Sequence, residues 1–313
     1  MILDNIETIA RLCDSGQYEE ADQLIPVQKR TLNSTQSFRS ALMLSAHNVK
    51  HLQKILDNQA ECIMLNLEDG VSEQEKPKAL RLCALLLSSL LTCKKKLVVR
   101  VNALDEGGED EIRYLAPYMP DAFRIPKVRS KEDVNRVLSL IGDSSELHLS
   151  IETKESWLAL KELRTDARVS TFYLGILDLL ADLQLPQSLI QLQNPTMHYI
   201  LSRFLLTCKA IGVKPVSFVF QDYRDSVTFK QWLELEKEMG YSAKGCLSPT
   251  QVGDTHDVLG MSELEIQRAQ EIIKRFEIKR EEGITGFDDA DYGFIDEPIY
   301  KGALAVLKNT ANI

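Results

Sequence analysis

The sequence lacks any apolar run long enough to cross a lipid bilayer. Its most apolar stretch, 84–91, contains two serines and is far shorter than the ~20 residues that a membrane-spanning helix needs. A basic excess is also missing, because 46 Asp and Glu residues stand against 37 Lys and Arg, a formal net charge of −9. Such a balance disfavours contact with phosphodiester backbones. We therefore expect neither a membrane protein nor a partner of nucleic acids.

The cysteines and histidines form no disulfide or zinc pattern. The six cysteines are scattered without two-residue spacing, and the one histidine pair four residues apart, His47 and His51, is more typical of a surface than of a metal site. No serine-hydrolase elbow and no glycine-rich phosphate loop is present. The first residues carry acids and no basic region, so we expect reduced thiols in a cytoplasmic protein.

From residue 40 onward, short apolar runs alternate with helical stretches, as in repeated βα units around a parallel sheet. The expected strands are 40–46, 61–67, 97–102, 122–127, 146–152, 170–174, 213–219 and 244–248. The expected helices are 48–59, 73–93, 109–117, 130–141, 153–164, 197–211 and 226–239, with 262–280 closing the ring. Eight of each predict the α/β fold of a (β/α)8 TIM barrel. An open doubly wound sheet usually has a glycine-rich turn after its first strand, and 45–48 contains no glycine.

Two segments lie outside this repeat. Residues 3–25 read as two short helices and 28–37 as a polar linker with little to bury. We expect three parts: an N-terminal helical extension with linker (1–38), a barrel (39–281) and a C-terminal helical segment (282–313).

In such barrels the chemistry lies where strands end, so these residues are the first candidates. The second strand runs into Glu68, Asp69 and Gly70, and both acids can face the barrel mouth only if the chain turns at the glycine. An acid there could equally cap the following helix. The third strand carries Arg100 near its end. Its guanidinium can grip a carboxylate through two parallel hydrogen bonds or form a salt bridge to Glu68 or Asp69.

Two further acids follow neighbouring strands. Glu152 stands at the end of the fifth expected strand and Asp178 shortly after the sixth. Each alone is typical of the first turn of a helix. Together at one opening they are what Mg²⁺ requires, a few protein oxygens completed by water and substrate. The pair indicates a metal site.

At this point the order of motifs resembles the citrate lyase β-subunit family within the HpcH/HpaI aldolase superfamily, which includes malyl-CoA and citramalyl-CoA lyases. The similarity spans nearly all of 39–305. It is carried by 39–40, Lys54, 65–71, 99–102, 126–127, 151–153, 175–179, Asp225, 240–245, 248–251, 263–276 and 295–298. The chain departs from the family at Ala46, Asn66 and Ser248, where proline, aspartate and histidine are usual, which leaves the acyl group open.

The resemblance implies a Mg²⁺-dependent carbon–carbon lyase that splits a 3-hydroxyacyl-CoA thioester into acetyl-CoA and a keto acid such as oxaloacetate, glyoxylate or pyruvate. By the same resemblance Glu152 and Asp178 hold Mg²⁺, Arg100 binds the keto acid, and Glu68 and Asp69 line the thioester side. It also implies a homo-oligomer, such as a trimer, whose C-terminal segment covers a neighbouring subunit. An acid of that segment then transfers the proton, with Asp288, Asp289, Asp291 and Asp296 as the choices.

Two other functions remain open. A class II aldolase acting on a free hydroxy-keto acid would use the same metal and arginine, and dependence on CoA separates it from the lyase. A non-catalytic barrel kept for assembly or regulation would tolerate neutral residues at 152 and 178.

Overall fold

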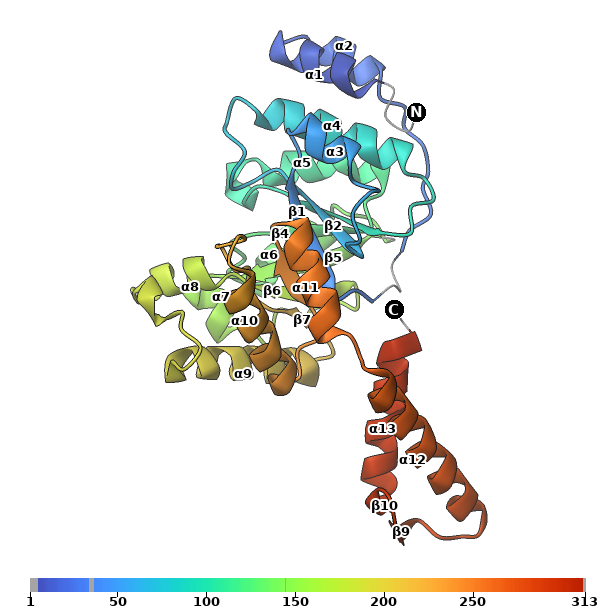
Figure 1. Ribbon diagram of the computed structural model, residues 1–313. Helices are drawn as coiled ribbons and strands as arrows, with labels where there is room; N and C mark the ends of the chain where they lie inside the picture. Colours follow the sequence, from blue (N-terminus) through green and yellow to red (C-terminus); the bar gives the residue numbers. More distant parts are fainter. Residues whose placement is uncertain (1–4, 34–36, 144, 312–313) are drawn as a thin grey trace. The chain divides into compact units, whose positions relative to one another are not determined.

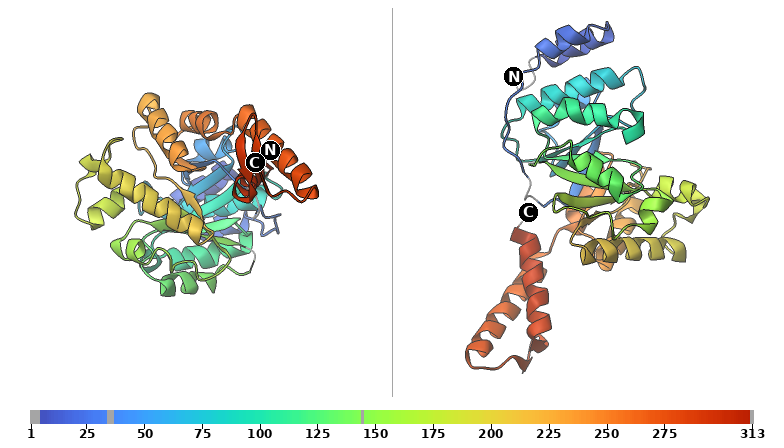
Figure 2. Two further views of the ribbon diagram at one scale, coloured as in Figure 1. Left: turned by 90° about the horizontal axis from the view of Figure 1, so that it is seen from below. Right: turned by 180° about the vertical axis from the view of Figure 1, so that it is seen from behind.

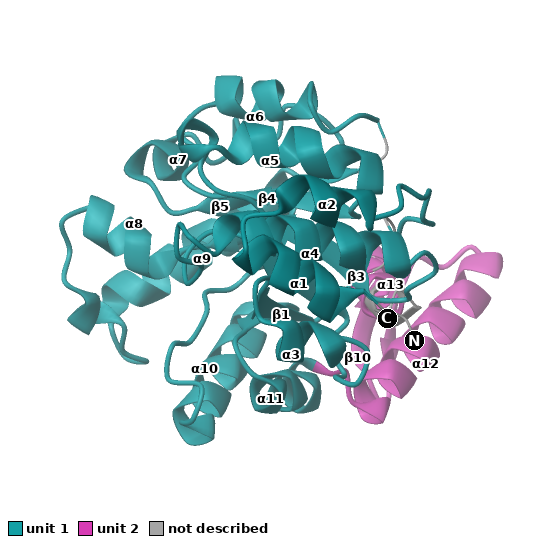
Figure 3. Ribbon diagram, turned by 90° about the horizontal axis from the view of Figure 1, so that it is seen from above, with its two compact units in different colours: residues 1–34, 38–259 teal, residues 35–37, 260–313 magenta. Residues whose placement is uncertain are grey.

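The computed structural model describes residues 5–33, 37–143 and 145–311, and it divides into two compact units. Unit 1 comprises 1–34 and 38–259, and unit 2 comprises 35–37 and 260–313 (Figure 3). The sequence placed the boundary at 281/282, whereas the structure places it at 259/260. The expected linker is described except for 34–36, which lie outside the described residues.

Unit 1 is built on eight parallel strands. They are β1 (Ser40–Ser45), β2 (Cys62–Asn66), β3 (Lys96–Arg100), β4 (Ala122–Ile125), β5 (Glu146–Ile151), β6 (Val169–Leu174), β7 (Lys214–Val216) and β8 (Lys244–Cys246). Their order is β7-β6-β5-β4-β3-β2-β1-β8. Figure 1 shows the strands at the centre of unit 1, among its helices. A parallel bridge between Ser217 and Lys244 joins the two outer strands, and the Ser217 amide donates to the Ala243 carbonyl at 3.1 Å. This contact closes the sheet into a barrel, and the predicted TIM-barrel fold is confirmed.

Helices follow the strands and surround the sheet (Figure 2). They are α3 (Val49–Gln53), α4 (Lys76–Ser89), α5 (Gly108–Leu115), α6 (Lys131–Leu138), α7 (Lys154–Leu158), α8 (Ile176–Asp182), α9 (Pro195–Ala210), α10 (Ser226–Met239) and α11 (Pro249–Leu259). Local signals fix several helix starts: Ser130 and Asp133 form a capping box before α6, and Asn194 caps α9 with Pro195 in its first turn.

The helix expected to close the ring, 262–280, is not the one that follows β8. That place belongs to α11, which packs against β1, β8 and α10. The prediction was wrong because α11 carries Gly253 and many polar residues and so lacks a strong apolar stripe. The helix at 262–280 does exist, as α12 (Glu263–Glu281), but it belongs to unit 2.

The strands are buried on both faces, and alternate residues serve two cores. Along β2, Ile63 and Leu65 belong to the large core between sheet and helices, while Cys62 and Met64 belong to a small core inside the barrel. The barrel interior also carries buried charged and polar side chains, namely Lys96, Arg124, Glu146 and His148.

The N-terminal residues belong to unit 1. Helices α1 (Ile6–Asp14) and α2 (Tyr18–Gln23) pack on α4, as the two short helices expected from the sequence. The segment after them is less free than a linker, because Arg30 is buried and pairs with Asp121 at 3.2 Å. This buried ion pair anchors the segment to the amino-terminal end of the barrel.

Unit 2 is a helical hairpin closed by two short strands. Helix α12 packs on α13 (Glu297–Ala311), and β9 (Gly286–Asp289) pairs antiparallel with β10 (Gly293–Asp296). Phe276 stacks on Tyr300 with ring centroids 4.6 Å apart. Across the described part of both units, no helix is long and apolar enough to pass through a membrane.

Candidate active site

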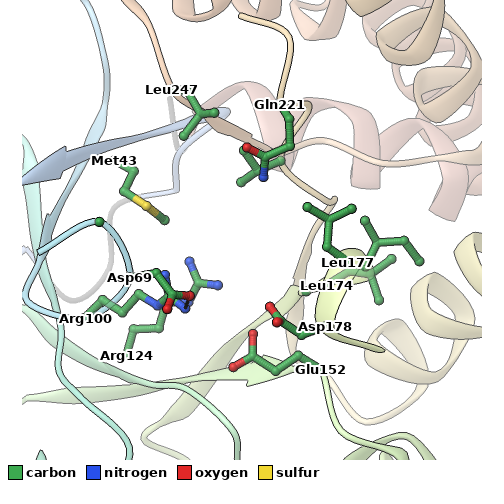
Figure 4. A pocket seen from close by; sticks show the side chains of 14 residues that line it. Met43, Asp69, Arg100, Arg124, Glu152, Leu174, Leu177, Asp178, Gln221 and Leu247 are labelled. Atoms are coloured by element: carbon green, nitrogen blue, oxygen red, sulfur yellow. Dashed lines mark hydrogen bonds and ion pairs between the residues drawn. The ribbon is translucent and has the colours of Figure 1, made fainter. Parts of the chain in front are cut away.

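A cavity of about 270 Å³ opens at the carboxyl ends of the barrel strands (Figure 4). Every strand, or the loop directly after it, contributes to the wall. The lining residues are Met43, Asp69, Gly70, Arg100, Arg124, Glu152, Leu174, Gly175, Ile176, Leu177, Asp178, Val219, Gln221 and Leu247. Four of the five residues singled out from the sequence are therefore brought to one cavity. The fifth, Glu68, lies directly behind Arg100.

Glu152 and Asp178 face the cavity together. Glu152 follows the end of β5 and is 3% exposed, whereas Asp178 lies in the first turn of α8 and is exposed. Figure 4 shows their carboxylates close to one another on the same wall. Burial raises the pKa of Glu152, although the charges of Arg100 and Arg124 oppose the shift.

The backbone at Lys127 orients Glu152. Lys127 has φ of 52°, in the left-handed region that few residues other than glycine adopt, and its amide donates to Glu152 Oε1 at 2.7 Å. The side chain of Lys127 turns to other acids, with Nζ 3.8 Å from Glu68 Oε1 and 3.7 Å from Glu106 Oε2. Lys127 thus serves as a structural partner of the site.

Gly175 makes room for the Glu152 side chain. A Cβ atom at this position would stand 2.5 Å from Glu152 Oε2 and 2.6 Å from Glu152 Cβ. Both distances are far below ordinary van der Waals contact. The glycine is needed because it lacks a Cβ atom. It is not needed for an unusual backbone conformation, since its φ of −86° suits any residue.

Arg100 is held by the two acids that follow β2. Its guanidinium pairs with the buried carboxylate of Glu68 and lies 3.3 Å from Asp69 Oδ2. Both acids reach it because the chain turns at Gly70, with φ of 83°, as the sequence required. The alternative of a helix cap does not apply, because α4 begins only at Lys76.

Two buried groups of this cluster have unused hydrogen-bonding capacity. Arg100 Nε has no hydrogen-bond partner among the described residues, and the Glu68 carboxylate has only ion-pair contacts. Burial raises the pKa of Glu68 to about 6 against the opposing charge of Arg100. Buried polar atoms without partners are uncommon in folded proteins and fit a site that a ligand completes.

Sequence reasoning missed Arg124. It lies within β4 and its side chain enters the barrel interior, where Nε donates to Ser150 Oγ at 2.9 Å. The available signal was an arginine in the middle of a strand otherwise made of Ala122, Phe123 and Ile125. A cation at such a position is rarely found without a purpose.

The donor set fits a hard divalent cation. The described residues contain no group of three or more His, Cys, Asp or Glu side chains that could enclose a metal. Two carboxylates at an open cavity match the way Mg²⁺ is held, with the remaining positions taken by water and substrate oxygens. Glu152 and Asp178 are the residues that would hold it.

A second, larger cavity of about 730 Å³ adjoins the first. The two share Met43, Asp69 and Leu247. Its other lining residues are Leu42, Leu44, Ser45, His51, Lys54, Asp57, Asn58, Asn66, Tyr223, Ser248 and Pro249. Asp69 therefore lies at the junction of a small polar cavity and a wide one.

The C-terminal acids considered for proton transfer are engaged within unit 2. Asp289 and Asp291 both pair with Arg275, the latter at 2.8 Å. Asp296 accepts from the Ile299 amide at the start of α13. Three of the four candidate acids thus have partners within unit 2, and a role of this segment in proton transfer stays a prediction.

Comparison with known proteins gives one consistent picture. The profile of the family described as HpcH/HpaI aldolase/citrate lyase matches residues 39–249. A (3S)-malyl-CoA thioesterase of Cereibacter sphaeroides is 30% identical over 241 residues, which cover 77% of this chain and 83% of the relative. Citrate lyase subunit β of Leuconostoc mesenteroides subsp. cremoris is 27% identical over 266 residues, 80% and 85% of the two chains.

Among solved structures, the protein CitE of Mycobacterium tuberculosis in complex with magnesium, acetoacetate and coenzyme A superimposes with a TM-score of 0.71. The match is 19% identical and covers 88% of this chain and 99% of that one. At this identity the likeness bears on the fold.

Proposed function

Because the chain belongs to the HpcH/HpaI aldolase/citrate lyase family, we propose that it is a Mg²⁺-dependent lyase. Its reaction splits, or in reverse forms, a 3-hydroxyacyl-CoA thioester of the citryl-, malyl- or citramalyl-CoA type, giving acetyl-CoA and a keto acid. The observation that carries the proposal is the cavity at the strand ends, where Glu152 and Asp178 face Arg100.

The metal's contribution is electrostatic. Bound between Glu152 and Asp178, Mg²⁺ would act as a Lewis acid on the oxygen that is hydroxyl in the thioester and carbonyl in the keto acid. The Lys127 amide fixes Glu152, and the space at Gly175 lets the Glu152 carboxylate reach the cavity.

Arg100 would stabilise the charge that develops on the same oxygen by donating a hydrogen bond to it. Its Nε–H has no acceptor in the described part of the chain, and Glu68 and Asp69 hold the guanidinium in place before substrate binds. Donors fixed in advance toward developing charge are worth most in a site shielded from water. Arg100 also offers the planar fork that suits the keto acid's carboxylate.

The thioester arm would occupy the second cavity. It is wide enough for an extended chain, and Lys54 and His51 in its wall provide cationic or polar contacts for the anionic end of such a cofactor. Asp69 lines both cavities, so it stands where the acetyl carbon and the keto acid would separate.

Proton transfer has to accompany the bond cleavage. When the carbon–carbon bond breaks, its electron pair goes to the acetyl carbon, which gains a proton, while the hydroxyl oxygen loses one and becomes the carbonyl. Asp69 lies at the junction of the two cavities, and burial raises the pKa of the neighbouring Glu68 to about 6. We assign them to this role together with the orientation of Arg100.

The test is an assay of purified protein with citryl-, malyl- and citramalyl-CoA, with and without EDTA. We expect keto-acid release from at least one thioester, abolished by the chelator and restored by Mg²⁺. Glu152→Gln and Asp178→Asn should each lower the rate ~100-fold or more, as loss of a group that stabilises the transition state does. Glu155→Gln is the matched control, because Glu155 lies three residues beyond Glu152, outside the cavity, and should retain full activity. Chelator-independent cleavage, or no cleavage of any of the three, contradicts the proposal.

Thioester hydrolysis is a second candidate, favoured by the relative named (3S)-malyl-CoA thioesterase. The products distinguish the two reactions. A lyase converts malyl-CoA into acetyl-CoA and glyoxylate with no free thiol, whereas hydrolysis gives malate and the free thiol of CoA. A thiol reagent and a keto-acid reagent used in parallel identify which bond breaks. Full activity on a free hydroxy-keto acid without CoA would instead favour the class II aldolase. The homo-oligomer and the cytoplasmic location stay predictions.

A further inference from the structure

Arg124 is a cation of the cavity whose charge no acid neutralises at close range. It is 5% exposed and lines the cavity floor, yet among the described residues it forms no ion pair. Arg100, its neighbour in the β3–β4 register, differs in this respect because Glu68 and Asp69 both pair with it. The cavity thus holds one compensated and one uncompensated guanidinium.

The contacts of Arg124 hold the side chain still without using up its donors. Nε donates to Ser150 Oγ at 2.9 Å, Nη1 approaches Met64 Sδ at 3.0 Å, and the guanidinium lies 4.2 Å from the centre of the Tyr173 ring. A thioether is a weak acceptor, and an arginine offers five N–H donors. Several donors, Nη2 among them, therefore remain for a ligand.

The location is suited to the far end of a small substrate. Arg124 pairs with His148 in the β4–β5 register, and His148 precedes Glu152 by four residues. The Arg124 side chain therefore enters the cavity from deeper in the barrel than the two metal-binding acids. Figure 4 shows its guanidinium beside that of Arg100 and across the cavity from Glu152 and Asp178. A keto acid with its first carboxylate at the metal would direct its other end toward this floor.

We propose that Arg124 determines substrate specificity by binding a second acidic group, so that the keto acid released by this site is a dicarboxylate. The inference rests on the proposed lyase function and deepens it. A neutral acceptor would leave the buried charge uncompensated, whereas a carboxylate supplies both the charge and the planar shape that a guanidinium pairs with.

The experiment compares two thioesters that differ by one carboxylate. Citryl-CoA carries a carboxymethyl group where citramalyl-CoA carries a methyl group, and their products are oxaloacetate and pyruvate. We expect the wild type to prefer citryl-CoA in kcat/KM by about 10- to 100-fold, the effect of one or two charge-assisted hydrogen bonds. Arg124→Met should abolish this preference by lowering kcat/KM for citryl-CoA. For citramalyl-CoA, kcat/KM should change by less than about threefold.

Two control variants separate specificity from a structural role. Arg124→Lys keeps the positive charge and should retain part of the preference. Arg129→Met removes an exposed cation from the loop after the same strand, outside this cavity, and should leave the preference intact. An Arg124→Met enzyme that loses activity equally on both thioesters overturns the proposal, as does a wild type that cleaves both equally well.

Ligand binding provides a readout that does not need turnover. In the presence of Mg²⁺, oxaloacetate should raise the melting temperature of the wild type more than pyruvate does, because at equal concentration the ligand that binds more tightly stabilises the folded protein more. If none of the citryl-, malyl- and citramalyl-CoA thioesters is cleaved but this difference persists and disappears in Arg124→Met, the lyase proposal fails and the role of Arg124 stands. If both thioesters are cleaved and the two acids bind alike, the role of Arg124 fails and the lyase proposal stands. Absence of any difference together with absence of cleavage refutes both.

Discussion

Gly175→Ala is the substitution whose consequence follows most directly from the geometry. The new Cβ would meet Glu152 Oε2 at 2.5 Å and Glu152 Cβ at 2.6 Å, and the second atom is fixed to the backbone at the end of β5. A change of rotamer therefore cannot relieve the clash. The ends of β5 and β6 would have to separate by nearly 1 Å, or the carboxylate would have to leave its place.

Two effects should result. Overpacking of this kind typically costs ~1–3 kcal/mol of unfolding free energy. A displacement of about 1 Å at a catalytic site can lower the rate ~100-fold. We expect both in Gly175→Ala, together with a smaller Mg²⁺-dependent rise in melting temperature, because Glu152 is one of only two carboxylates assigned to the metal.

Gly253→Ala is the matched control. It makes the same chemical change inside helix α11, where the added Cβ would have no atom within 4 Å. Alanine is favoured over glycine in a helix by roughly 0.5–1 kcal/mol, so this variant should be as stable as the wild type or more so. Urea denaturation measures the stability, and thermal shift with and without Mg²⁺ measures the site. Equal stability of the two variants with an unchanged response to Mg²⁺ would refute the reasoning.

The remaining predictions concern three other groups. Arg100→Met should lower kcat ~100-fold or more, since a donor aimed at developing charge contributes ~3–4 kcal/mol to the barrier, and steady-state kinetics showing less than a tenfold loss would remove Arg100 from the mechanism. Asp121→Ala should lower the free energy of unfolding, measured by urea denaturation, by ~3–5 kcal/mol, because it leaves the buried Arg30 without its acid. The control Asp110→Ala, on the exposed face of α5, should lower it by less than ~0.5 kcal/mol. Burial lowers the pKa of His148 to about 4 from 6.5, so the folded state disfavours protonation and stability should fall by ~3 kcal/mol as the pH drops from 6.5 to 4. His148→Gln should flatten the dependence of the urea midpoint on pH in this window, and an equally steep profile in that variant would place the titration elsewhere.

Much of this protein could be predicted from the linear sequence. The eight strands were found because each is a short apolar run bounded by turn or helix signals, and the family expected from the motifs is confirmed by the profile match and by the citrate lyase relatives. The lyase class of enzyme is confirmed at the same level. Arg100, Glu152 and Asp178 could be identified from the sequence because each stands at or just after the end of a strand, where the functional groups of a parallel barrel lie.

Other features were hidden from the sequence for identifiable reasons. Helix α11 was missed because its apolar stripe is weak, and α8 because seven residues are too few for a helical period to be distinct. Arg124 was missed because alternation along β4 gives two faces without saying which one lines the barrel.

The sequence by itself determined the eight strands of the barrel and most of its helices, because hydrophobic periodicity is a local property of the chain. Only the tertiary structure decided that Arg100 is neutralised by Glu68 and Asp69 while Arg124 is not, and that Gly175 leaves the space that Glu152 fills. These relations depend on strand register and on closure of the sheet between β7 and β8. Such long-range geometry sets distances of a few ångströms between residues that are 23 to 32 positions apart, and no local pattern records it.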